Sequence, residues 1–222
     1  EIERKRRIGS CNTRPYNIFK RRTSMCKSSP DILYQAACIW FDLTQYQYKF
    51  TYGLKNRLHV IHLTFFSEDF PHLAGFQYLK DISFPRYNRG KVILRILDKT
   101  ITMESIQKAQ QFEKMVLPRL HAMIQIKEIL EHDFLLYSYA PHRYPFYTKI
   151  KADYFISSHT STPLFIFLIQ SDSGIYSCCS TFEQTDRNYR QNQLSLTLLK
   201  KERIQFSTQT SVILFDRLSS NQ

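Results

Sequence analysis

The chain has 222 residues, 43% of them hydrophobic and 14% aromatic, which is enough for one sizeable hydrophobic core. It contains no run of about 18 apolar residues, so we expect no membrane-spanning helix and no membrane partner. The formal net charge is +12, and much of it lies in residues 1–30, where nine Lys and Arg accompany two Glu. Such a basic, mostly irregular leader fits nucleic-acid binding through phosphate contacts and fits a disordered, solubilising tail equally well.

The first predicted elements follow this leader. Asp31 is expected to cap a helix in DILYQAACIWFDLTQY, because the apolar residues of this segment recur at helical spacing. Residues 46–66 contain two aromatic or β-branched runs on either side of a short turn with a glycine, YQYKFTYGLKNRLHVIHLTFF. This pattern predicts a β-hairpin.

The middle of the chain is predicted to be helical. One helix is expected to begin at Thr102, where Thr-Met-Glu-Ser places an acid in the first turn. A proline at position 118 is expected to kink or restart the last helix. The other predicted helices cover residues 67–81, 88–97 and 112–130.

Strand patterns follow from residue 133. Five short β-branched or aromatic segments are separated by Pro, Gly, Ser and Asn: DFLLYSYA, PFYTKIKADYFIS, PLFIFLIQ, IYSCCSTF and LSLTLLKK. The last segment, SVILFDRL, fits either an edge strand or a tail. The fold class is therefore α+β, with an N-terminal helix and β-hairpin, central helices and a C-terminal antiparallel sheet. We expect one domain over residues 31–206, between the leader and a C-terminal tail at 207–222.

The common catalytic signatures are missing. The sequence contains no GxSxG or HExxH motif and no dinucleotide fingerprint, and its five glycines form no phosphate-binding loop. Its five cysteines are odd in number and lack metal-ligand spacing. We therefore expect no metal and no cofactor, and a reduced, cytoplasmic setting.

A dispersed set of polar residues remains as candidates for a site. His72 lies early in a predicted helix, beside a proline. Lys149 and Lys151 are two residues apart on a predicted strand and should share one face. A structural histidine, and lysines that protect an edge strand, would produce the same pattern. Three more candidates lie at and after the end of a later strand: Ser180, Thr181 and Tyr189.

The segment SEDFPHLAGFQYLKDI resembles a signature of one nuclease family. The matching residues are Phe70, His72, Leu73, Gly75, Leu79 and Asp81. The segments KVILRILDKTITMESI and YTKIKADYFI, and the block from CCSTF to KKERI, resemble further parts of the same family in the same order. The family is the fourth of the phage-type barnase–EndoU–colicin–RelE-like (BECR) nucleases of phages and bacterial mobile elements, and the resemblance covers about residues 31–206.

This resemblance implies a BECR-like ribonuclease fold and a metal-independent endoribonuclease that cleaves RNA by attack of its own 2′-OH. The expected substrate is single-stranded RNA or tRNA, and the expected setting is a toxin or mobile-element effector with an antitoxin or immunity protein as a partner. An RNA-binding or protein-interaction module without catalysis remains an alternative reading.

The resemblance also implies roles for single residues. His72 would be the base; a nearby helix N-terminus would lower its pKa, and its ring would point toward Lys149. Lys149 would hold a phosphate oxygen, and Thr181 and Tyr189 would donate to the developing charge or act as the acid. The expected substrate-binding residues are Lys91, Lys151 and Ser180.

Overall fold

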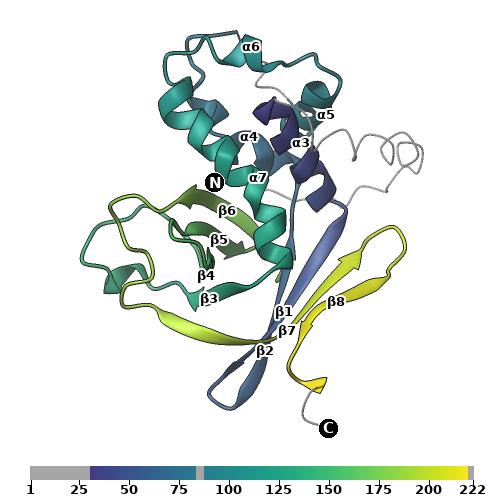
Figure 1. Cartoon of the computed structure of the whole chain (residues 1–222), viewed down its shortest axis with the longest axis vertical. Coiled ribbons are helices and arrows are strands. Elements are labelled where there is room, and N and C mark those ends of the chain that lie inside the picture. Colours follow the sequence, from purple (N-terminus) through teal and green to yellow (C-terminus); the bar gives the residue numbers. More distant parts are fainter. Residues whose placement is uncertain (1–30, 84–87, 220–222) are drawn as a thin grey trace.

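The computed structural model describes residues 31–83 and 88–219. The predicted leader therefore lies outside the described residues. The helices gather at one end of the molecule and the strands extend away from them (Figure 1). Within the described residues no helix is long and apolar enough to span a membrane.

The predicted first helix and its cap are confirmed. α3 (Ile32–Leu43) follows Asp31, whose Oδ1 accepts a hydrogen bond from the Tyr34 backbone N–H at 3.1 Å. This bond satisfies one of the free N–H groups at the helix start. The apolar stripe of α3 is buried, with Trp40 1% exposed.

The single helix predicted for residues 67–81 is wrong. The segment forms three short pieces: η1 (Ser67–Asp69), α4 (Phe70–Leu73) and η2 (Phe76–Tyr78). The break lies at Gly75, which has a left-handed backbone with φ of 82°. A Cβ atom at this position would lie 2.7 Å from the carbonyl oxygen of Met115. Only glycine fits both this φ and this close approach.

The remaining helices follow the predicted order. η3 (Arg89–Lys91) and α5 (Val92–Leu97) occupy the predicted 88–97 segment, and Thr102 caps α6 (Met103–Ile106) through a capping box with Ser105. A π-helix, η4 (Phe112–Val116), leads into α7 (Leu117–Glu131). Pro118 lies in the first turn of α7, where its missing N–H costs little, so the helix restarts there as expected.

Among residues 31–83 and 88–219, eight strands form one sheet, in the order β1-β2-β6-β5-β4-β3-β7-β8. Their bounds are β1 (Tyr46–Leu54), β2 (Arg57–Thr64), β3 (Phe134–Ser138), β4 (Tyr154–Ser158), β5 (Leu164–Gln170), β6 (Tyr176–Glu183), β7 (Leu194–Gln205) and β8 (Ser211–Asp216). β1 also pairs with β7, so seven strands close into a barrel and β8 adds to the edge of β7. The mixed α+β class is therefore confirmed.

Two details of the predicted sheet need correction. The hairpin β1–β2 is confirmed, but it belongs to the same sheet as the C-terminal strands, and β2 meets β6 in a parallel pairing at Leu63 and Tyr176. The long strand β7 joins the hairpin to the C-terminal strands, because β1 pairs with one edge of β7 while β3 and β8 pair with the other edge. Residues 211–216, for which both an edge strand and a tail were expected, form the edge strand β8.

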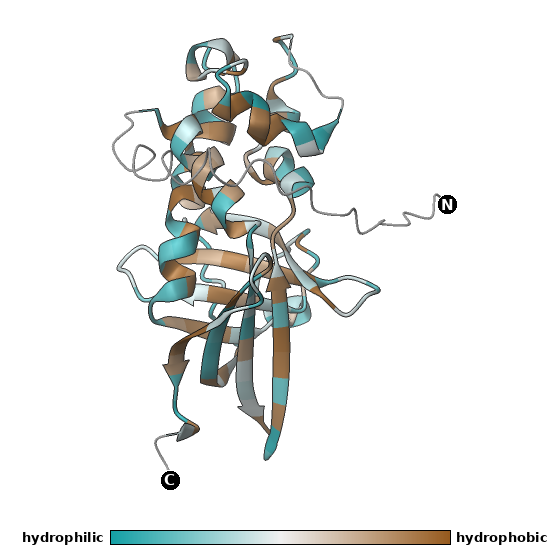
Figure 2. Cartoon of the chain, turned by 90° about the vertical axis from the view of Figure 1, so that its right-hand side faces the viewer, coloured by the Kyte–Doolittle hydropathy of each residue, from teal (hydrophilic) through white to brown (hydrophobic). Residues whose placement is uncertain are grey.

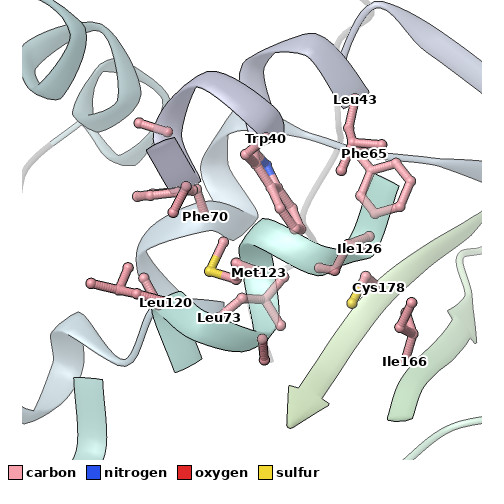
Figure 3. Close-up of a cluster of buried hydrophobic side chains, with 14 of the residues drawn as sticks. Trp40, Leu43, Phe65, Phe70, Leu73, Leu120, Met123, Ile126, Ile166 and Cys178 are labelled. Atoms are coloured by element: carbon pink, nitrogen blue, oxygen red, sulfur yellow. The ribbon is translucent and has the colours of Figure 1, made fainter. Parts of the chain in front are cut away.

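The main core lies between the helices and the barrel. α7 packs between α3 and strands β5 and β6, with Met123 and Ile126 facing the labelled core residues of the neighbouring elements (Figure 3). Trp40 anchors this core: its ring lies edge-on to Phe65 at 5.2 Å, and its Nε1–H donates to the Phe66 carbonyl at 3.0 Å. Apolar bands alternate with polar ones along the strands, as expected for strands with one buried face (Figure 2).

A second buried cluster covers the opposite face of β3, β4 and β5. Its members are mostly aromatic: Tyr137, Tyr139, Tyr144, Phe155, Phe165, Phe167 and Tyr189. We call this set the aromatic cluster. Two loop segments contribute to the cluster and lie against this face: residues 139–152 and the loop before β7.

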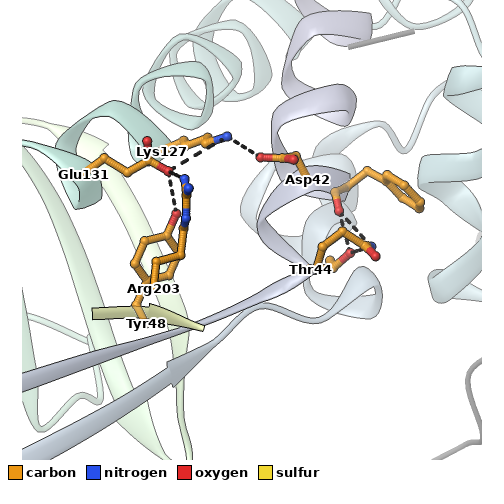
Figure 4. A network of polar contacts seen from close by, with 8 residues as sticks. Asp42, Thr44, Tyr48, Lys127, Glu131 and Arg203 are labelled. Atoms are coloured by element: carbon orange, nitrogen blue, oxygen red, sulfur yellow. Dashed lines mark hydrogen bonds and ion pairs between the residues drawn. The ribbon is translucent and has the colours of Figure 1, made fainter. Parts of the chain in front are cut away.

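A polar network ties the helices to the barrel (Figure 4). Glu131 of α7 accepts hydrogen bonds from the Tyr48 hydroxyl at 3.2 Å and from Arg203 of β7. Lys127 forms an ion pair with Asp42 of α3 at 2.5 Å. Because these groups are partly buried and mutually neutralised, they hold α3, α7, β1 and β7 in one arrangement.

Lys201 of β7 is an unusual member of the core. Its side chain is only 2% exposed and faces the same side as its register partner Phe50. Its Nζ donates to the His132 carbonyl and lies 4.9 Å from the ring centroid of Phe134. Burial lowers the pKa of this ammonium, and nearby acids oppose that effect in part.

We expect the charge of Lys201 to make stability depend on pH. The folded chain binds this proton less firmly than the unfolded chain, so the free energy of unfolding should rise with pH between the lowered folded pKa and the ordinary value of 10.5. Lys201→Met should remove this rise. Lys201→Ala should be less stable than Lys201→Met by about 2 kcal/mol, because it leaves a cavity. Urea denaturation at several pH values tests both; an unchanged pH dependence in Lys201→Met would contradict the assignment.

Three cysteines lie within the described residues. Cys178 and Cys179 are free thiols, and burial raises both pKa values, that of Cys179 to about 12. Neither is therefore activated as a nucleophile. Cys38, on α3, is buried in the main core.

Candidate functional site

His72 occupies an exposed position near the end of α4. The flanking residues Pro71 and Leu73 are buried, so the short helix is anchored while the imidazole faces outward. Partial burial lowers the pKa of His72, and the positive charges of Arg89 and Arg119 lower it further. The expected direction of the shift is thus confirmed, but its cause is not a helix dipole: α4 has four residues and His72 lies in its last turn.

Two arginines from distant segments reach the surroundings of His72. Arg119 lies at the start of α7; its Nη1 donates to the Met115 carbonyl, and its guanidinium lies 5.2 Å from the ring centroid of Tyr78. Arg89 belongs to η3, which packs against η1 just before α4. Lys91 is exposed in the same turn as Arg89. His72, Arg89 and Arg119 form what we call the His72 site, and Lys91 lies two residues after Arg89 in η3.

The Gly75 turn organises this site. It sends the chain from α4 into η2, so that Tyr78 lies beneath the Arg119 guanidinium. The site therefore combines an imidazole whose lowered pKa favours its neutral, proton-accepting form with cations that can bind phosphate oxygens.

Lys149 and Lys151 lie elsewhere. They are exposed on the loop that precedes β4, because the predicted strand at 145–157 begins only at Tyr154. Side-chain contacts replace ladder bonds in this segment: the Tyr139 hydroxyl donates to the Ile150 carbonyl, and the Cys179 thiol donates to the Lys151 carbonyl. Within the described residues, no hydrogen bond or charge interaction joins His72 to Lys149.

Thr181 and Tyr189 face opposite sides of the sheet. Thr181 is 3% exposed and pairs with Ile166, whose side chain belongs to the main core. Its Oγ1 is buried without a hydrogen-bond partner. Tyr189 belongs to the aromatic cluster, and its carbonyl accepts a bond from the Tyr144 hydroxyl at 2.8 Å. Ser180 is partly exposed and pairs with Phe167.

Lys91 lies in η3, which contributes Arg89 to the His72 site. The loop that carries Lys149 and Lys151 packs, through Ile150 and Ala152, against the aromatic cluster that contains Tyr189. The arginines at positions 89 and 119 were missed. Neither has a spacing relation to His72 in the sequence; the nearby Gly75 was the available signal for a close approach, but it does not identify the approaching segment.

The fold is a seven-stranded barrel with a helical layer at one end, and it carries an exposed histidine beside two arginines. The model of one family, described as phage-Barnase-EndoU-ColicinE5/D-RelE like nuclease4, matches residues 32–218. The chain belongs to this family. Neither the curated proteins nor the solved structures contain a match to the chain. The family description suggests a nuclease, and hence a nucleic-acid substrate.

Proposed function

We propose that this protein is an endoribonuclease that cleaves RNA at the His72 site. The observation that carries the proposal is an exposed imidazole whose pKa is lowered beside two guanidinium groups. An imidazole that is neutral near pH 7 can accept a proton, and fixed guanidinium groups can bind a phosphodiester and its developing charge. Family membership supports the same class of reaction.

In the proposed reaction, neutral His72 accepts the proton of a ribose 2′-OH. The 2′ oxygen forms a bond to phosphorus while the bond from phosphorus to the 5′ oxygen breaks, which leaves a 2′,3′-cyclic phosphate. The proton returns from the imidazolium to the departing 5′ oxygen, directly or through water. Arg89 and Arg119 stabilise the negative charge of the pentavalent phosphorus, and Lys91 binds a flanking phosphate.

The other predicted site residues receive different roles in this proposal. Thr181 and Tyr189 are too deeply buried to contact RNA in this conformation, so we assign them no step of the reaction. Lys149 and Lys151 are exposed and available for RNA, but no hydrogen bond among the described residues joins them to the His72 site, and they receive no step of the reaction. The proposed chemistry requires the 2′-OH, so DNA should not be cut.

The decisive experiment measures cleavage of RNA by the wild-type protein in EDTA. We expect cleavage of single-stranded RNA or tRNA that yields 2′,3′-cyclic phosphate ends, and no cleavage of an oligonucleotide with deoxyribose at the scissile position. The chelator tests the proposed metal independence. RNA bound without any cleavage would favour the alternative, a non-catalytic RNA-binding module.

A toxin or mobile-element role is a further part of this proposal, supported by the family description alone. It implies that expression of the active protein slows growth, that an inactive variant does not, and that a neutralising partner restores growth.

A further inference from the structure

A row of outward-facing side chains lies on the loop before β4. Along residues 147–153, exposed residues alternate with partly buried ones, as in an extended chain. The exposed members are Tyr147, Lys149, Lys151 and Asp153. Tyr147 is 75% exposed, although a large aromatic ring in water forgoes the stabilisation that burial would give it.

The inward side of this loop is held by the aromatic cluster. The Tyr139 hydroxyl donates to the Ile150 carbonyl at 3.2 Å, and the Cys179 thiol donates to the Lys151 carbonyl at 3.3 Å. The side chains of Ile150 and Ala152 pack against the cluster. The outward row is therefore held in place before any ligand binds, which lowers the entropic cost of binding.

A third cation lies beside this row. Arg187 is exposed, its Nη1 donates to the Tyr147 carbonyl at 3.0 Å, and its guanidinium lies 5.3 Å from the ring centroid of Phe146. Two acids are also near in sequence. The carboxylate of Asp153 already accepts a bond from the Gln170 N–H at 2.8 Å, and Asp186 precedes Arg187.

We propose that Tyr147, Lys149, Lys151 and Arg187 form a binding surface for single-stranded RNA, separate from the His72 site. Alternate residues of an extended chain are roughly 6.6 Å apart, a spacing on the scale of successive phosphates in an extended strand. Lys149, Lys151 and Arg187 contact these phosphates, and one base stacks on Tyr147. The proposal deepens the proposed function, since it rests on RNA as the substrate, and it gives the protein a surface that selects unpaired strands.

The test is binding of a fluorescein-labelled uridine oligonucleotide, followed by fluorescence anisotropy at several salt concentrations. All measurements use the His72→Ala background, so the result does not depend on cleavage. Tyr147→Ala should weaken binding about fivefold or more, and Tyr147→Phe should restore it. Lys149→Gln combined with Lys151→Gln should weaken binding and reduce the salt slope by about 1.4.

The matched control removes two exposed lysines from other turns, Lys55→Gln combined with Lys99→Gln, and should have little effect. An equal loss in this control, or equal binding of duplex and single-stranded RNA, would overturn the proposed surface. Either result would leave the cleavage proposal intact. Conversely, suppose that binding depends on Tyr147, Lys149 and Lys151 but that the wild-type protein cuts no RNA. This result would support the binding surface and reject the nuclease proposal.

Discussion

His72→Gln should lower the rate of RNA cleavage by about 10²–10⁴-fold, the usual contribution of a positioned general base. Glutamine is close to histidine in size and polarity but cannot accept the proton at neutral pH. Because His72 is exposed and its neighbours Pro71 and Leu73 hold α4 in the core, we expect the variant to fold normally. Single-turnover cleavage rates and urea denaturation measure the two effects separately.

The pH profile of the wild type should carry the signature of the same group. The base form of His72 predominates above its pKa, which lies below the ordinary value of 6.5, so cleavage should persist under mildly acidic conditions and fall only at lower pH. Arg119→Gln should move this acid limb toward higher pH, because it removes a positive charge that disfavours the imidazolium. NMR titration of the imidazole gives the same pKa without reference to activity.

The matched control is His159→Gln, at an exposed histidine in the turn between β4 and β5. This variant should cleave RNA at the wild-type rate, and its rate should fall at the same low pH as that of the wild type. Full activity of His72→Gln, or an equal loss in His159→Gln, would reject His72 as the base.

Gly75→Ala should be among the most destabilising substitutions in the chain, with a loss of about 2–4 kcal/mol in the free energy of unfolding. A left-handed backbone costs a residue with a Cβ about 1–2 kcal/mol. The added methyl would also lie 2.7 Å from the Met115 carbonyl oxygen and 3.0 Å from Cδ of Arg119, so η4 and α7 would have to move.

Gly174→Ala provides the matched control, because Gly174 has a similar φ of 80° while its added Cβ would lie 3.9 Å from the Gln170 side chain. Gly174→Ala should lower the free energy of unfolding by about 1–2 kcal/mol, the cost of the left-handed backbone alone. Urea denaturation of both variants isolates the close approach at Gly75. Equal losses would show that the approach of Met115 to Gly75 contributes nothing.

Gly75→Ala should also reduce cleavage beyond its effect on folding. Arg119 lies against the same glycine, so the added methyl displaces a guanidinium of the His72 site. The kcat measured on the folded fraction should fall, while His159→Gln leaves it unchanged.

The sequence-based predictions were right where the structure depends on interactions between residues close together in the chain, and wrong where it depends on distant ones. Asp31 caps α3 and Thr102 caps α6 through bonds to residues within three positions. The β1–β2 hairpin likewise depends on its own turn and on alternation along two adjacent segments. By contrast, the predicted 67–81 helix was wrong: it breaks at Gly75, whose left-handed backbone lies close to the carbonyl of Met115, a residue far away along the chain.

The candidate site also combines residues that a local motif identifies with residues that only long-range packing brings near. His72 was identifiable from the sequence because the family motif is local. Arg89 and Arg119 were not, since packing of η3 and α7 against this motif brings them there. Lys149 and Lys151 were correctly expected to share a side, but their segment is a loop anchored by Tyr139 and Cys179 rather than a strand.

The sequence alone therefore determined the mixed α+β class, the family, the helix caps and the hairpin, all of which depend on local patterns or a local motif, and it led to the proposal of His72 as a site residue. The tertiary structure alone decided the closure of the barrel through β1 and β7, the charges around His72, and the separation of Thr181 from Tyr189. The physical reason is that these features depend on contacts between residues far apart in the chain, which no spacing rule within a segment specifies.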